Sequence, residues 1–411
     1  MRGEAQSARQ LHASLVRVLS DVDHGDSSIA HYIWQAWTTG DGFVTESCIA
    51  LLGKRDIPTD AIEEYCQYLA IGLLSYEVRL EIRRVPWEIH GWQDSLRTLR
   101  LQAAEWKNRW VLVQYTALSW SSRGFPWGFL RVLDILISAR ALVAIVYHDV
   151  QPFPGTRLVD RVRRLTQVRI MRYALRHAHL ALFTVPMEKL SWLPRFYSNA
   201  HFIPIGPNLP IPAGPNRPSE TSNGTVDRTV APIVSIFGIT GGNAGISETK
   251  LIIAAVGQAA QQLGKLRLSI FGRHADLRES LLRDGFQGLP VELTVEGVID
   301  PPQVIRRLSE SDVLLFVRGP ISSRRGSAIA GIACGLPVIA YPGSETAAPI
   351  TEAGVVLVSP DKPDELNAAL VRVLSDTGYR KILASRSQAA YNAYFAWPVI
   401  ARQLNALLRT R

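Results

Sequence analysis

The sequence predicts an α/β protein built from two doubly wound parallel sheets, and three features support this prediction. Its 411 residues are too many for one ordinary hydrophobic core and suit two domains of roughly 200 residues each. Short apolar runs alternate with amphipathic stretches, which is typical of strand–helix–strand units with parallel strands. Residues 207–231 interrupt this alternation with Pro, Gly, Ser, Thr and Asn, as an interdomain linker does. We therefore expect an N-terminal Rossmann-like domain over residues 1–206 and a C-terminal one over residues 232–411.

In the N-terminal half, a charged and periodic stretch, about residues 1–28, predicts a helical extension rather than a signal peptide. Short apolar runs predict strands, namely His31–Trp37, Glu77–Ile82, Trp110–Thr116, Leu142–Tyr147, Leu180–Val185 and His201–Ile205. Helical spacing predicts helices, namely Asp60–Ser75, Gln93–Trp106, Gly128–Ile137 and Arg157–Arg176. An extra segment, Phe43–Thr59, separates a Gly40–Gly42 loop from the helix expected to begin at Asp60.

The same alternation resumes after the linker. The predicted strands are Ile233–Phe237, Arg267–Phe271, Val291–Val295, Val313–Val317, Val338–Tyr341 and Val355–Val358. The predicted helices are Glu248–Gln262, Ala275–Asp284, Pro302–Ser309, Ser327–Cys334 and a closing helical region, Lys362–Leu408. We expect the last helix to pack back toward the N-terminal domain. Open parallel sheets bind ligands at the carboxyl ends of their strands, which we expect to face an interdomain cleft.

The charge balance narrows the possible partners without selecting one. Lys and Arg number 45 against 36 Asp and Glu, a net charge of +9 that suits an acidic small molecule, an anionic membrane surface or nucleic acid. Nucleic acid is the least favoured, because no concentrated basic stripe with interleaved aromatic residues is present. Three cysteines without metal-ligand spacing favour a reduced cytosol and no metal. No uncharged apolar run is long enough to span a bilayer, so any membrane contact is expected to be peripheral.

Several predicted strands of the second half end in glycine, which lets a backbone approach a phosphate or a base closely. Gly238 and Gly241 follow the first strand, and Gly297 follows the third. The stretch GITGGNAG that begins at Gly238 has neither the Walker nor the dinucleotide-binding spacing. Lys250, expected to open the next helix, suits a diphosphate contact or a solvated helix start. The glycines are equally compatible with tight turns that bind nothing.

The stretch ISSRRGSAIAGIACGLPVIAY, from Ile321 to Tyr341, gives a stronger indication of an anion site. Arg324 and Arg325 precede a predicted helix, where free N–H groups and the helix dipole already favour an anion. A guanidinium forms a planar fork that matches phosphate oxygens, and two such cations oppose the dipole unless an anion sits beside them. Serine hydroxyls and a glycine complete the segment (Ser322, Gly326 and Ser327). The alternative is a surface arginine pair that bridges to acidic neighbours.

In the first half, His148-Asp149 ends the apolar run LVAIVYHD, so the histidine is expected at the carboxyl edge of the sheet. Asp149 also suits a simple cap of the next turn. Gln114 and Tyr115 end the neighbouring strand and lead into a polar-aromatic loop, Ser119–Phe129, which contains Arg123. This loop suits stacking on a sugar or an aglycone, or ordinary aromatic packing.

With these segments identified, the chain resembles retaining glycosyltransferases of the GT-B fold, in particular the large family 4 group (glycosyl transferases group 1). The family's C-terminal helix and strand motif ends as Ala333–Ala340 does, and SDVLLF, VEGVI and the tail from Glu352 to Asp376 add further matches. VYHDV and FIPIGPN carry the resemblance into the N-terminal half. It covers about residues 230–400 best, extends over 110–210 and fades before 110.

The chain departs from this family at one point. The family places two glutamates eight positions apart in the C-terminal motif, the first near the donor sugar and the second near the ribose. Counting back from Ala333-Cys334-Gly335 puts Ser322 at the first position and Ala330 at the second. The arginine pair, followed by Gly326 and Ser327, resembles a subgroup in which an R-R-G-S signature replaces the glutamates.

The resemblance implies a metal-independent, retaining, hexosyltransferase-like enzyme that moves a sugar from a UDP-, GDP- or ADP-sugar to a saccharide or lipid-linked acceptor in bacterial polysaccharide or glycoconjugate synthesis. The implied location is cytoplasmic, with possible contact of the basic helix Arg157–Arg176 with the inner membrane face. A solvated helix face is the favoured alternative for that helix. Other functions left open are an inactive nucleotide-sugar-binding protein and a GT-B-fold epimerase; a phosphorylase is disfavoured because no lysine stands where pyridoxal would bind.

Under this function each candidate residue has an expected role. His148 and Asp149 are the catalytic candidates, with His148 contacting the sugar or stabilising an oxocarbenium-like transition state. The donor-binding candidates are Gly238, Gly241, Lys250, Arg273, Gly297, Val298, Ser322, Arg324, Arg325, Gly326 and Ser327. The arginines and Lys250 are expected to hold the diphosphate, and the Gly297-Val298 backbone to read the base. The acceptor-binding candidates are Gln114, Tyr115 and Arg123.

Overall fold

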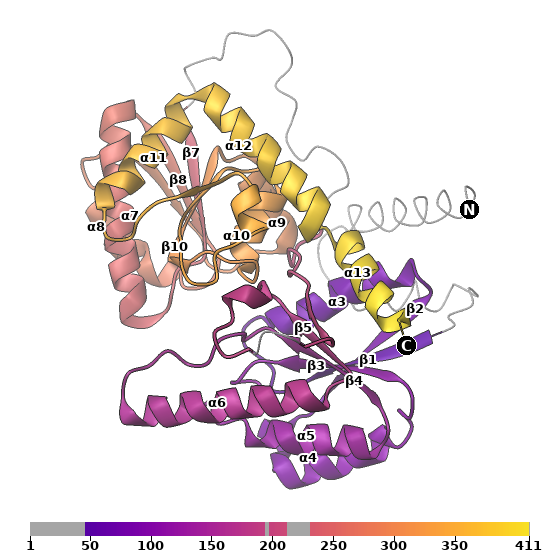
Figure 1. The fold of residues 1–411 in the computed structure, drawn as a ribbon. Helices are drawn as coiled ribbons and strands as arrows, with labels where there is room; N and C mark the ends of the chain where they lie inside the picture. The colour runs from indigo at the N-terminus through magenta and orange to yellow at the C-terminus, as the bar shows by residue number, and fades with distance from the viewer. Residues whose placement is uncertain (1–45, 194–196, 212–230, 411) are drawn as a thin grey trace, which may run out of the picture. The chain divides into compact units, whose positions relative to one another are not determined.

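The computed structural model describes residues 46–193, 197–211 and 231–410, which form two compact α/β units (Figure 1). The N-terminal unit comprises described residues up to Asn208 together with Trp397 onward, and the C-terminal unit comprises Leu209–Ala396. The expected extension at 1–28, the strand His31–Trp37, the Gly40–Gly42 loop and most of the expected linker lie outside the described residues. The described helices include none that is long and apolar enough to cross a membrane.

The N-terminal unit is built on a six-stranded parallel sheet of order β2-β1-β3-β4-β5-β6. Its strands are β1 (Glu46–Leu52), β2 (Val78–Arg84), β3 (Trp110–Tyr115), β4 (Leu142–Tyr147), β5 (Leu180–Phe183) and β6 (Ala200–Phe202). The helices α4 (Trp87–Ala103), α5 (Trp127–Ser138) and α6 (Leu158–His177) lie on one face, and α3 (Ala61–Leu74) and α13 (Trp397–Arg409) on the other (Figure 1). Apolar clusters on both faces explain why the strands read as nearly continuous apolar runs.

The segment Phe43–Thr59, for which no strand was predicted, belongs to the sheet. This region contains β1, an inner strand that pairs in parallel with both β2 and β3. Five consecutive residues, Cys48–Leu52, are buried, so the strand shows no alternation of polar and apolar residues. A short apolar run without alternation is compatible with a strand or a buried helix, which explains why its period did not identify it.

The final helix, α13, belongs to the N-terminal unit although it lies at the end of the chain. Its residues Trp397, Ile400 and Leu404 join the apolar cluster that contains α3. The Trp397 Nε1 atom donates a hydrogen bond to the carbonyl of Pro207 (2.7 Å). The indole N–H of Trp110 donates to the carbonyl of Leu408 (3.1 Å), so both ends of the helix are fixed to the unit.

The C-terminal unit has a second six-stranded parallel sheet, of order β12-β11-β10-β7-β8-β9. Its strands are β7 (Ile233–Phe237), β8 (Leu266–Phe271), β9 (Val291–Val295), β10 (Val313–Pro320), β11 (Val338–Tyr341) and β12 (Val355–Leu357). Its α-helices are α7 (Gly242–Leu263), α8 (Glu279–Gly285), α9 (Pro301–Ser309), α10 (Gly326–Ala333), α11 (Pro363–Ser375) and α12 (Thr377–Ala390). The predicted α/β class with two doubly wound parallel sheets is thus confirmed.

One helix boundary in this unit differs from the prediction in a way that affects the site. Helix α7 begins at Gly242 instead of Glu248, because tertiary packing holds a glycine-rich first turn that has poor intrinsic helix propensity. Lys250 therefore lies about two turns inside the helix, exposed, and does not open it. The prediction that Lys250 lies at the N-terminus of this helix is therefore wrong.

The small residues of the arginine segment have a packing role. Helix α10 lies so close to β10 that a Cβ atom on Gly331 would be 2.4 Å from Cδ2 of Leu314. All of its residues from Ala328 to Ala333 are buried. This close approach holds the second half of α10 against the first residues of β10, and the two arginines precede the other end of this short buried helix.

Candidate functional site

The strand order of each sheet reverses at one place, and at such a switch point the carboxyl ends of two neighbouring strands diverge and leave a crevice. In the C-terminal sheet it lies between β7 and β10, because the chain proceeds outward from β7 to β9 and then crosses back. Gly238 follows β7 there, with a positive φ of 79°. On the other side, Nη1 of Arg318, near the end of β10, is 2.6 Å from where a Cβ of Gly238 would stand. A residue not identified from the sequence, Arg318, thus lines this crevice.

Arg325 is the second cation at this edge. It occupies the N-cap position of α10, and its Nε donates a long hydrogen bond to the carbonyl of Pro320 (3.3 Å). Its guanidinium lies against Gly319, the residue after Arg318. Within the described ranges, neither Arg318 nor Arg325 forms an ion pair with a carboxylate. Two half-buried guanidinium groups therefore lie close enough at this edge to repel each other, and neither is ion-paired with a described residue.

Electrostatics at this edge favour an anion. Burial lowers the pKa of Arg318, and the charge of Arg273 lowers it further, while Glu248 opposes the shift. Burial likewise lowers the pKa of Arg325, with added repulsion from Arg324 and Arg318 against attraction from Glu345. A lowered pKa means that each cation is destabilised where it stands, so a bound anion would stabilise both.

Arg324, in contrast, is already neutralised. Its Nε and Nη2 atoms donate to the two carboxylate oxygens of Glu345 (2.7 and 3.0 Å), in a bidentate pair with both side chains largely buried. The sequence left open whether the arginine pair binds an anion or bridges to acidic neighbours. The second arrangement applies to Arg324, and the first stays available to Arg325.

Two further buried polar groups at this edge have no hydrogen-bond partner among the described residues. They are the hydroxyl of Ser322, a residue that is 1% exposed, and Oε1 of Glu248. The other carboxylate oxygen of Glu248 accepts a hydrogen bond from the backbone N–H of Thr240 (3.0 Å), which fixes the loop after β7. A buried polar atom left unpaired costs free energy, so both atoms mark places where a ligand group would be stabilised.

The remaining donor-binding candidates lie at the same carboxyl edge, apart from Lys250. Gly241 is the N-cap of α7, and Gly326 and Ser327 are the first residues of α10. Arg273 follows β8, and its backbone carbonyl accepts a hydrogen bond from Ile239 N–H (3.0 Å). The carbonyl of Gly297, after β9, accepts from Gly272 N–H, and the side chain of Val298 is 53% exposed.

In the N-terminal unit, His148 lies directly after β4 and is 9% exposed. Its Nε2 is 2.8 Å from Oε1 of Gln114. The amide nitrogen of Gln114 donates to the Leu112 carbonyl, so Oε1 faces the histidine and Nε2 of His148 acts as the donor. The ring of Tyr65 packs edge-on against the imidazole. Gln114 is 1% exposed, so it positions His148 and offers no surface to an acceptor.

The other N-terminal candidates are distributed unevenly. Tyr115 is 1% exposed, belongs to the hydrophobic core and has its hydroxyl buried without a partner among described residues, and burial raises its pKa. Asp149 accepts a hydrogen bond from Ala117 N–H (2.8 Å), which caps the turn after β3. Arg123 is exposed, and its carbonyl accepts from Nε of Arg163. Of these three residues Arg123 is exposed, Asp149 is partly buried and Tyr115 is fully buried.

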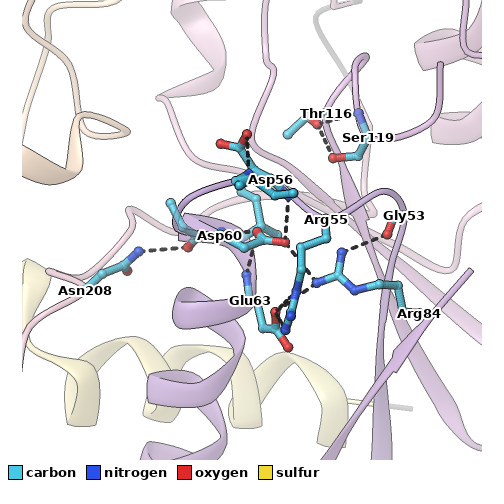
Figure 2. Close-up of polar contacts among 12 residues, drawn as sticks. Gly53, Arg55, Asp56, Asp60, Glu63, Arg84, Thr116, Ser119 and Asn208 are labelled. Atoms are coloured by element: carbon cyan, nitrogen blue, oxygen red, sulfur yellow. Dashed lines mark hydrogen bonds and ion pairs between the residues drawn. The ribbon is translucent and has the colours of Figure 1, made fainter. Parts of the chain in front are cut away.

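The switch point of the N-terminal sheet lies between β1 and β3, and Arg84 makes polar contacts with Gly53, Asp60 and Glu63 beside it (Figure 2). A Cβ atom on Gly53 would be 2.3 Å from the carbonyl oxygen of Ser119, which accepts hydrogen bonds from Lys54 N–H and the Trp87 indole. Beside it, Arg84 donates to the Gly53 carbonyl and pairs with two carboxylates, those of Asp60 and Glu63. The cation at this edge is fully partnered.

The polar-aromatic loop Ser119–Phe129 is largely packed. Trp120 and Phe129 are 0% exposed, and the Trp120 indole donates to the Gln114 carbonyl. Trp127, by contrast, is 55% exposed and lines a shallow groove of about 230 Å³ with the stacked pair Trp87 and Trp92. Most of the loop is thus ordinary aromatic packing, and the Trp127 ring is the aromatic part that stays exposed.

No group of His, Cys, Asp or Glu side chains within the described ranges is arranged to hold a metal ion. Cys48, Cys66 and Cys334 are free and buried, and burial raises the pKa of the Cys48 and Cys334 thiols to about 12. A thiol with so high a pKa is a poor nucleophile at neutral pH. The described cysteines are packing residues.

Comparison with known proteins supports this description of the C-terminal unit. Residues 236–376 match the family model described as glycosyl transferases group 1. This segment spans the switch point and contains Gly238, Glu248, Arg318 and Arg325. No curated protein matches the chain in sequence.

Solved structures of similar fold cover nearly the whole chain. Sucrose-phosphate synthase from Thermosynechococcus elongatus superposes with a TM-score of 0.62 at 18% identity, over 89% of this chain and 98% of that one. HepE from Anabaena, in complex with UDP and glucose, gives 0.61 at 14% identity, over 89% and 100%. A putative UDP-N-acetylglucosamine 2-epimerase from Listeria monocytogenes gives 0.57 at 11%, over 89% and 96%. The chain thus has the GT-B fold, and over residues 236–376 it carries the sequence pattern of the glycosyl transferases group 1 family.

Proposed function

We propose that the protein is a retaining glycosyltransferase that takes a sugar from a nucleotide-sugar and transfers it to a saccharide or lipid-linked acceptor. One observation carries the proposal: Arg318 and Arg325, half-buried and without carboxylate partners in the described ranges, line the switch-point crevice within the segment that matches the group 1 family. The donor's diphosphate is the anion with the matching charge and reach. UDP and glucose in the HepE complex support a nucleotide-sugar as the ligand class.

In this proposal the two arginines stabilise the charge that accumulates on the leaving diphosphate as the bond to the sugar breaks. Arg325 and the free N–H groups at the start of α10 contact one phosphate, and Arg318 contacts the other. Ser322 Oγ and Glu248 Oε1 are both buried without a partner in the described ranges. The Ser322 hydroxyl donates a hydrogen bond to the nucleotide-sugar or accepts one from it, and Glu248 Oε1 accepts one from a hydroxyl of that ligand. Arg324, paired with Glu345, holds the segment in place.

His148 is the proposed catalytic group of the N-terminal unit, and Gln114 is the residue that positions it. The hydrogen bond between Nε2 of His148 and Gln114 fixes the orientation of the imidazole ring. In this orientation the imidazole contacts the transferred sugar. Asp149 holds the adjacent turn instead of acting on the substrate. The acceptor is expected to reach Arg123 and the open aromatic edge at Trp127.

Release of nucleoside diphosphate from a panel of UDP-, GDP- and ADP-sugars tests the proposal. The native protein is expected to release it, Arg325→Ala to lose release at least about a hundredfold, and the exposed control Arg306→Ala to behave as native. Donor binding without turnover, across candidate acceptors, favours an inactive binding protein, consistent with the missing glutamates at Ser322 and Ala330. Conversion of the sugar without transfer favours an epimerase. Unchanged turnover in His148→Ala would contradict the role given to that residue.

A further inference from the structure

The first half of α6 places apolar side chains outward. Leu158, Val162 and Leu165 are 77%, 50% and 57% exposed, and their i, i+4, i+7 spacing puts them on one face of the helix. Three neighbouring aliphatic side chains in water form a contiguous patch, unlike a single exposed leucine. Helix α6 is long, and in its second half the buried residues are apolar, including Ile170 and Ala174. Only in the first half of α6 do apolar side chains point to solvent while polar ones are buried.

The inward face of this first half is polar and fully used by the fold. Asp160 accepts a hydrogen bond from Arg157 N–H and pairs with Arg163 (2.7 Å). Gln167 accepts from Phe153 N–H (2.7 Å) and donates to the Gly124 carbonyl (2.8 Å). The helix is therefore anchored by polar contacts, and the three aliphatic side chains contribute nothing to that anchoring.

Two arginines flank the outward apolar residues. Arg161 follows Leu158 at i+3, and Arg169 follows Leu165 at i+4, so both lie on the same face. Both are exposed, and within the described part of the chain neither forms an ion pair or a side-chain hydrogen bond. We call these five residues, Leu158, Arg161, Val162, Leu165 and Arg169, the α6 stripe.

We infer that the α6 stripe docks on an anionic lipid surface. A helix that carries aliphatic residues between arginines inserts its apolar side chains at the headgroup level while its cations meet anionic headgroups. Arginine and leucine side chains are both long enough to reach that boundary from one helix face. A second copy of the chain is a poorer occupant, because antiparallel pairing centred on Leu165 would place Arg161 opposite the Arg169 of the other copy.

This inference extends the proposed function, in which a lipid-linked acceptor is one possibility, but it is measured separately. Flotation of the full chain with vesicles, without any nucleotide, reports docking alone. Vesicles of phosphatidylcholine are compared with vesicles that also contain phosphatidylglycerol, at low and high salt. A protein that docks but releases no nucleoside diphosphate would contradict the proposed function and leave the inference standing.

The native protein is expected to bind the anionic vesicles at low salt and to dissociate at high salt. Arg161→Gln with Arg169→Gln is expected to weaken binding about thirtyfold, since each surface arginine contributes about fivefold. Leu158→Ser, Val162→Ser and Leu165→Ser together are expected to weaken it at least about tenfold. Matched controls elsewhere are Arg100→Gln with Arg131→Gln, and the exposed aliphatic set Leu101→Ser, Leu277→Ser and Ile382→Ser.

Three results would overturn the inference. The first is equal binding to neutral and anionic vesicles, or none to either. The second is native binding by the triple-serine variant, with its thermal unfolding unchanged to show that it is folded. The third is a native dimer that the triple-serine variant dissociates, which would assign the stripe to a second copy of the chain.

Discussion

The switch points of the two sheets use arginine in opposite ways. In the N-terminal sheet, Arg84 is held by the Gly53 carbonyl, Asp60 and Glu63, and the backbone closes the crevice through Ser119 (Figure 2). In the C-terminal sheet, Arg318 and Arg325 stand in the equivalent place without a carboxylate partner in the described ranges. Both arrangements position cations at the carboxyl ends of strands, but only the second leaves their charge available to a ligand. The partners of the arginines therefore distinguish an edge that the fold itself neutralises from one whose cations stay available.

The largest expected effect comes from deleting the available charge. Arg318→Ala together with Arg325→Ala is expected to lower the affinity for nucleoside diphosphate at least about a hundredfold, because each removes a charge-assisted hydrogen bond of about 1.5–3 kcal/mol. Calorimetric titration of the full chain with UDP, GDP and ADP measures this. Thermal stability is expected to stay the same or rise, since two mutually repelling cations are removed. Undiminished affinity would show that the diphosphate binds elsewhere.

The glycines at the two switch points provide the next test. Gly53→Ala pushes a Cβ atom to 2.3 Å from a backbone carbonyl, so the N-terminal unit must shift, at a cost of about 3 kcal/mol in unfolding free energy. Gly238→Ala, at positive φ, costs about 1–2 kcal/mol, and the atom it displaces is the tip of the Arg318 side chain.

The two substitutions should therefore differ in kind. Denaturant unfolding is expected to respond mainly to Gly53→Ala, and nucleotide titration mainly to Gly238→Ala. If Gly53→Ala weakened nucleotide binding while leaving stability intact, the N-terminal crevice would be a binding edge after all, and the comparison would fail.

The sequence predicts the architecture well where strands are buried on both faces. β4, β7 and β11 begin and end at the predicted residues, because their apolar runs are bounded by turn residues. β1 escaped prediction because ESCIALL, without alternation, has no period that separates a strand from a helix. The start of α7 was missed because its glycine-rich first turn opposes intrinsic propensity and is held by packing.

The site was only partly predictable for a related reason. The R-R-G-S segment predicts an anion site from local signatures, a helix start and two arginines, and the structure places it after β10 at the carboxyl edge of the C-terminal sheet. Arg318, however, only follows the predicted strand Val313–Val317, and its importance depends on its approach to Gly238 across the switch point. Ion pairs between residues far apart in the chain are equally hard to predict: no sequence feature near Arg324 indicates that Glu345 neutralises it.

Arg84→Ala tests the N-terminal side of the comparison and is expected to have an intermediate effect. It removes three hydrogen bonds and leaves the Asp60 carboxylate without this cation, while Glu63 keeps Arg55, so the unfolding free energy should fall by about 2 kcal/mol. Affinity for nucleoside diphosphate should not change. Arg83→Ala is the matched control: its side chain is 52% exposed and paired with Glu81, and its loss should cost less than about 1 kcal/mol. An Arg84→Ala variant as stable as the Arg83→Ala variant would contradict the structural role.

The smallest effect is expected where arginine is paired within the binding edge itself. Removing Arg324 alone would leave the 9%-exposed Glu345 carboxylate free to neutralise Arg325, so the informative variant removes both partners, as Arg324→Ala with Glu345→Ala. Because this variant leaves Arg325 and Arg318 unpaired, affinity for nucleoside diphosphate should change by less than about threefold. Glu345→Ala alone should raise the affinity, since it frees a third cation beside the first two. If the double variant instead lost binding as fully as the Arg318 and Arg325 pair, Arg324 would exchange Glu345 for the phosphate when the donor binds. Glu345 would then occupy, in the free protein, the place that the phosphate takes when the donor binds.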